Sequence, residues 1–148
     1  MDSKETARGL IHSFFSTLID KDVERIGSLC DEGVRLIWGP YVFEGRQEIT
    51  RWSKEFLTQF SCLKYKETEF KMEGNTASEK MILEITTQKG QTGVIRCEGI
   101  FKFKDKKIEM IKFLFSAGVI LIEKEESVGL NLHKIKVNYK NKRFDDDY

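Results

Sequence analysis

The fold is decided by the segment Ile95-Arg96-Cys97-Glu98-Gly99-Ile100-Phe101-Lys102-Phe103, in which apolar or small residues largely alternate with charged ones. Because successive side chains of a β-strand point to opposite faces, this segment predicts a strand with one buried face. Two further segments alternate in the same way, and the expected core face carries Met81, Leu83, Ile85, Ile95, Cys97, Gly99, Phe101, Phe103, Ile111, Phe113 and Phe115. The opposite face is expected to be solvated and carries Lys80, Glu84, Arg96, Glu98, Lys102 and Lys112.

Polar turns separate these strands from one another. They lie at Glu73-Gly74-Asn75, at residues 89–93 and at Lys104-Asp105-Lys106, with the glycine and aspartate chemistry that hairpins use. The sequence therefore predicts four antiparallel strands after residue 61.

The first half of the chain has helical periodicity. Apolar residues at helical spacing predict helices over residues 7–19, 23–30 and 49–61, the last ending near Ser61. Between the second and third helices, residues 34–38 and 41–43 favour two short strands around Gly39-Pro40.

Length and composition limit the class of protein. A chain of 148 residues with 40% hydrophobic and 33% charged residues fits one ordinary domain, which we expect over residues 1–122. Residues 123–148 are expected to be a C-terminal extension with an extra strand around Leu130–Tyr139 and then a frayed tail. The longest apolar run, residues 118–122, is too short to span a bilayer, so no membrane partner is expected.

Charge and cysteine content exclude further classes. A net charge of +1 without a basic block predicts no nucleic-acid partner. The polar N-terminus has no secretory signal pattern, which predicts a cytoplasmic protein. Cys30, Cys62 and Cys97 are odd in number and far apart, so neither a disulfide framework nor a metal site is expected.

The order of these elements resembles the nuclear transport factor 2-like superfamily, particularly its SnoaL-like and ketosteroid isomerase-like branches. The resemblance rests on residues 10–15, 22–26 and 42–49, and on the closing segments 101–103 and 111–113. It implies an α+β fold in which a cone-shaped, curved antiparallel sheet packs on three N-terminal helices, as in a cystatin-like α+β barrel. It also implies a homodimer. No cofactor is expected.

The resemblance does not carry over the steroid isomerase chemistry. It places Phe14, Trp38 and Gly99 where that enzyme has a tyrosine, a general base and a neutral acid. Without a base and oxyanion donors the proton transfer loses its assistance, so steroid isomerase activity is not expected. The Asp-Arg-Asp device of the epoxide hydrolase branch finds no match either.

Three hypotheses on function follow. The first is a SnoaL-like protein that binds a small apolar or aromatic molecule in its cone. The second is an isomerase-, cyclase- or lyase-type enzyme, whose catalytic candidates are His12, Tyr41 and Cys97. The third is a protein-interaction module with a filled pocket. The residues expected to line the pocket, or to fill it, are Phe14, Leu18, Trp38, Trp52, Phe56, Gly99, Phe101, Phe113 and Phe115.

Overall fold

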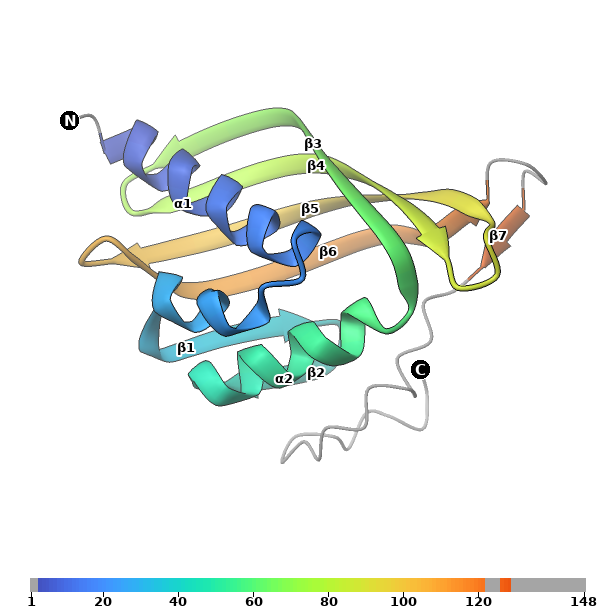
Figure 1. Ribbon diagram of the computed structural model, residues 1–148. Helices are drawn as coiled ribbons and strands as arrows, with labels where there is room; N and C mark the ends of the chain where they lie inside the picture. Colours follow the sequence, from blue (N-terminus) through green and yellow to red (C-terminus); the bar gives the residue numbers. More distant parts are fainter. Residues whose placement is uncertain (1–2, 122–125, 129–148) are drawn as a thin grey trace.

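A computed structural model describes residues 3–121 and 126–128 of the chain (Figure 1). The helices are α1 (Ser3–Ile19), the 3-10 helix η1 (Val23–Leu29) and α2 (Arg46–Leu57). The strands are β1 (Cys30–Trp38), β2 (Tyr41–Glu44), β3 (Phe60–Glu73), β4 (Thr76–Thr87), β5 (Thr92–Lys104), β6 (Lys107–Leu121) and β7 (Glu126–Val128).

One curved sheet forms the body of the protein. Its strand order is β2-β1-β6-β5-β4-β3, with β7 added beside β6. Every pair is antiparallel except β1 with β6, which run parallel. Figure 1 shows the helices on one face of the sheet, with α1 in front of the β3–β5 side and α2 in front of β1 and β2. The α+β architecture with three N-terminal helices and a curved sheet is therefore confirmed, and the sheet is open, with β2 and β3 at its edges.

The predicted faces of the sheet are confirmed wherever side chains are described. The inward residues of β4, β5 and β6 named above are all buried, from Met81 to Phe113 in chain order, and Phe101 and Ile111 are fully enclosed. Lys80, Glu84 and Arg96 on the opposite face are exposed. Alternation in the sequence thus fixed which side chains meet the helices.

The helix boundaries differ from the expectation at several points, and α1 and α2 begin earlier than their apolar patterns, at Ser3 and Arg46. The second helix is a single 3-10 segment, and Cys30 already belongs to β1. The third helix ends at Leu57 rather than near Ser61. Phe60 fits the helical spacing of the apolar residues, but it is the first residue of β3. Its ring still packs on Phe56, with the two centroids 5.1 Å apart, so it joins the same core as the helix.

The C-terminal extension is described only at β7, where Val128 pairs with Val119 of β6. The strand expected around Leu130–Tyr139 and the expected tail lie outside the described residues. None of the helices in the described part of the chain combines the length and apolar character needed to cross a bilayer.

Candidate functional site

The residues expected to line a pocket pack against one another in the middle of the molecule. Trp52 stacks on Phe56 with ring centroids 5.2 Å apart, and Trp38 meets both Trp52 at 5.4 Å and Phe113 at 5.7 Å. The described members of the set are all buried, namely Phe14, Leu18, Trp38, Trp52, Phe56, Gly99, Phe101 and Phe113, whereas the side chain of Phe115 lies outside the description.

The space beside Gly99 is occupied. A methyl group added there would come within 2.7 Å of Cε1 of Phe101 and 3.1 Å of Cε of Met81. The absence of a side chain at Gly99 therefore makes room for the Phe101 ring rather than for a ligand.

The three catalytic candidates are not brought together. Tyr41 is buried on the edge strand β2, while His12 of α1 lies against β3 at the opposite edge of the sheet. Cys97 lies on β5, where burial raises the pKa of its thiol to about 12, so that the thiol is protonated at neutral pH.

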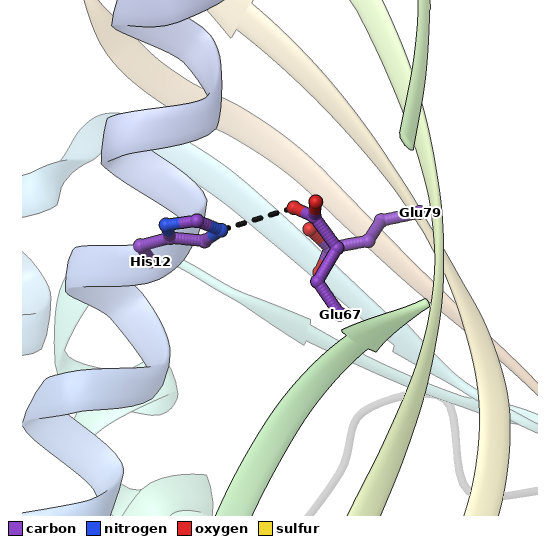
Figure 2. A group of neighbouring side chains, drawn as sticks. All are labelled: His12, Glu67 and Glu79. Carbon is purple, nitrogen blue, oxygen red and sulfur yellow. Dashed lines mark hydrogen bonds and ion pairs between the residues drawn. The ribbon is translucent and has the colours of Figure 1, made fainter. Parts of the chain in front are cut away.

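His12 instead belongs to a polar cluster between α1 and the β3–β4 hairpin, which we call the seam cluster. It consists of Arg8, His12, Tyr65, Glu67 and Glu79. Arg8 and His12 lie one helical turn apart on α1, Tyr65 and Glu67 share the inward face of β3, and Glu79 points inward from β4. In Figure 2 the His12 ring and the two carboxyl groups point toward one another across the seam.

Glu67 is the centre of the cluster. Its Oε1 atom lies 3.0 Å from Nε2 of His12 and accepts a hydrogen bond from Nε of Arg8 at 3.1 Å. Nη2 of Arg8 pairs with Oε2 of Glu67, which completes a bidentate ion pair. The hydrogen bonds from Arg8 are the main cause that lowers the pKa of Glu67 to about 2.

Glu79 is a fully buried carboxyl group beside this ion pair. Tyr65 donates its hydroxyl proton to Oε1 of Glu79 at 2.5 Å, and Oε2 of Glu79 has no hydrogen-bond partner within the described ranges. Burial, and then the nearness of Glu67, raises the pKa of Glu79 to about 8, so this carboxyl is largely neutral at pH 7. Burial, and then the hydrogen bond to Glu79, also raises the pKa of Tyr65.

A cavity lies next to the seam cluster at one end of the curved sheet, which we call the open end of the cone. Its volume is about 390 Å³, and it lies between the first turns of α1 and the β3–β4 and β5–β6 turns, which Figure 1 shows at the same end of the molecule. Ala7, Leu10, Met72 and Phe103 provide apolar walls, and Asn75 provides an amide.

Comparison with known proteins identifies the fold. No family model and no curated protein matches the sequence. Among solved structures, a nuclear transport factor 2-like protein of unknown function from Burkholderia pseudomallei has a TM-score of 0.66 at 13% identity, covering 75% of this chain and 91% of that one. The chain has the fold of the nuclear transport factor 2-like superfamily.

Two enzymes share this nuclear transport factor 2-like fold with the chain. An epoxide hydrolase from M. tuberculosis has a TM-score of 0.67 at 11% identity, covering 78% of this chain and 86% of its own. The epoxide hydrolase/cyclase-like enzyme SalBIII, which has a role in pyran ring formation in the polyether salinomycin, has a TM-score of 0.67 at 15% identity. The match covers 78% of this chain and 93% of SalBIII. Both likenesses concern the fold.

Two of the positions that the resemblance to ketosteroid isomerase had marked lie apart from the seam cluster, whereas the third, Gly99, is the cross-strand partner of Glu79. Phe14 and Trp38 belong to the aromatic interior, while Glu67 lies on the edge strand β3, beside α1. Sequence reasoning named only His12 of the cluster as a catalytic candidate. Glu79 did leave a signal, because it interrupts an otherwise apolar inward register between Ala77 and Met81.

Proposed function

We propose that this protein binds a small apolar or aromatic molecule at the open end of its cone. The observation that carries the proposal is the cavity of about 390 Å³ beside α1, whose size is within the range of small-molecule sites. Its apolar walls would contribute most of the binding free energy through burial of the ligand.

The arrangement of the interior supports this position over the middle of the cone. Trp38, Trp52 and Phe113 contact one another and leave a ligand less room there than at the open end. The Asn75 amide at the rim would orient a ligand that carries one hydrogen-bonding group.

Amide chemical shifts measured during titration with 1-naphthol and with cyclohexanol test the proposal. We expect the changes to gather at Ala7, Leu10, Met72 and Phe103. The variant Leu10→Trp should fill the cavity and raise the Kd at least tenfold. Ile19→Trp, at an exposed position near the end of the same helix, is the matched control and should bind as the wild type does.

Two results would contradict the proposal. Shift changes centred on Trp38 and Trp52 would place the ligand in the cone interior, and Leu10→Trp binding as tightly as the wild type would exclude the cavity. The filled-pocket hypothesis and the isomerase-, cyclase- or lyase-type hypothesis stay hypotheses. The homodimer and the cytoplasmic location stay predictions as well.

A further inference from the structure

The seam cluster has the composition of a metal site. His12, Glu67 and Glu79 each offer one ligand atom, and these atoms all lie within 4.8 Å of one another. Two ligands bound at right angles to a first-row metal ion are about 3 Å apart, because each metal–ligand bond is about 2.1 Å long. The 3.0 Å separation between His12 Nε2 and Glu67 Oε1 already matches this spacing.

A buried oxygen without a partner points to a ligand at the same place. Oε2 of Glu79 has no hydrogen-bond donor among the residues that the structure describes, although the residue is fully buried. A buried polar atom without a partner is costly, and such atoms in native proteins mark strain, catalysis or a bound water or ion. Glu79 extends toward Glu67 in Figure 2, which places this carboxyl group within the cluster.

The neighbouring side chains hold the carboxyl groups as an outer layer of a metal site would. Arg8 binds Oε2 of Glu67, and Tyr65 donates to Oε1 of Glu79. Oε2 of Glu79 is thereby left for a ligand. Oε1 of Glu67, which accepts from Nε of Arg8 and lies beside His12, would exchange part of this hydrogen bonding for the ion. The rings of Tyr65 and His12 meet edge to face with their centroids 5.8 Å apart, a contact that helps to orient the imidazole. Outer partners of this kind fix ligand orientation in metal sites.

From this geometry we propose that His12, Glu67 and Glu79 bind one divalent first-row transition-metal ion, of the class of Mn²⁺, Fe²⁺ or Zn²⁺. One imidazole and two carboxylates form a nitrogen and oxygen set that suits these ions better than Ca²⁺, which prefers oxygen ligands alone. A divalent ion would also supply positive charge between the Glu67 carboxylate and the buried carboxyl group of Glu79. The ion would enter between His12 and Glu67, where the imidazole side chain is 47% exposed.

The test uses the full chain, treated with EDTA and then freed of it by dialysis. Titration with Mn²⁺, followed by calorimetry and by electron paramagnetic resonance, should show one ion bound per chain. Zn²⁺ should compete with it. Bound Mn²⁺ should broaden the NMR signals of the His12 and Tyr65 rings.

Variants distinguish this site from binding elsewhere on the chain. Glu79→Gln and His12→Asn should each weaken Mn²⁺ binding at least tenfold, and Arg8→Gln should weaken it less. His12 lies on an exposed part of α1, so His12→Asn should remain folded even if Glu79→Gln does not. Glu84→Gln, on the exposed face of the same strand β4, is the matched control and should leave binding unchanged.

Either of two outcomes would overturn the proposal. One is the absence of Mn²⁺ and Zn²⁺ binding at millimolar concentration. The other is binding that His12→Asn leaves as tight as in the wild type. Leu10 lines the small-molecule cavity and is not one of the proposed metal ligands, so Leu10→Trp should leave Mn²⁺ binding unchanged. The two proposals can therefore fail independently.

Discussion

Replacing Gly99 by alanine should destabilise the protein, because the added methyl group would enter space that Phe101 already occupies. The new carbon would lie 2.7 Å from Cε1 of Phe101 and 3.2 Å from its Cζ, both closer than ordinary van der Waals contact. Cε of Met81, at 3.1 Å, is the end of a flexible chain and can turn away. The rigid Phe101 ring must therefore move instead.

The surroundings of Phe101 decide what that movement costs. The ring is fully buried, and the rings of Phe14, Phe15 and Phe113 have centroids 6.5, 6.5 and 6.4 Å from it. Forcing an extra carbon into a packed interior costs about 1–3 kcal/mol. At about 2–4 °C per kcal/mol for a chain of this size, the Tm should fall by about 2–12 °C.

Thermal and urea unfolding followed by circular dichroism would measure this change. Gly9→Ala is the matched control, because a methyl group there meets no atom within 4 Å and Gly9 lies inside α1. It should stabilise the protein by about 0.5–1 kcal/mol, since alanine favours a helix. A Gly99→Ala variant as stable as the wild type would contradict this prediction and would mean that the cone interior has room for a ligand.

Two further predictions concern Glu79 and Trp38. In the presence of EDTA, the free energy of unfolding of the wild type should fall as pH rises from about 4.5 to about 8, because folded Glu79 keeps a proton that the unfolded chain has released. Glu79→Gln should abolish this fall in urea unfolding at pH 5 to 8, and the same slope in both proteins would show that folded Glu79 is ionised. Trp38→Ala should cost about 3–5 kcal/mol, because the indole is 2% exposed and contacts three other aromatic rings. An unchanged Tm would remove Trp38 from the core.

The sheet could be predicted because its signal is local. In β5 each inward side chain from Ile95 to Phe103 is two residues from the next, and the turns beside it carry Gly90 and Asp105. Both turn residues adopt positive φ, which glycine and aspartate tolerate better than most residues. The end of α2 was harder to place, because Phe60 contributes to the core from a strand as readily as it would from a helix.

The seam cluster could not be predicted, because it depends on contacts between distant parts of the chain. His12 and Glu67 are 55 residues apart, and they meet only because the curved sheet brings its edge strand against α1. β3 also has a register shift between Glu67 and Glu69, after which its half-buried residues, Phe70 and Met72, fall at even instead of odd positions.

This bulge explains why the sequence pattern of β3 did not reveal which of its side chains face inward. The bulge also has a structural role. A strand that alternated without interruption would put either Glu67 or Phe70 on the wrong face. With the bulge, Glu67 reaches His12 and Arg8 while Phe70 still faces α1, where the guanidinium of Arg8 lies 5.2 Å from the centre of its ring. Bulges commonly re-aim a side chain next to a functional site, so the irregularity in β3 and the unpartnered oxygen of Glu79 point to the same part of the molecule.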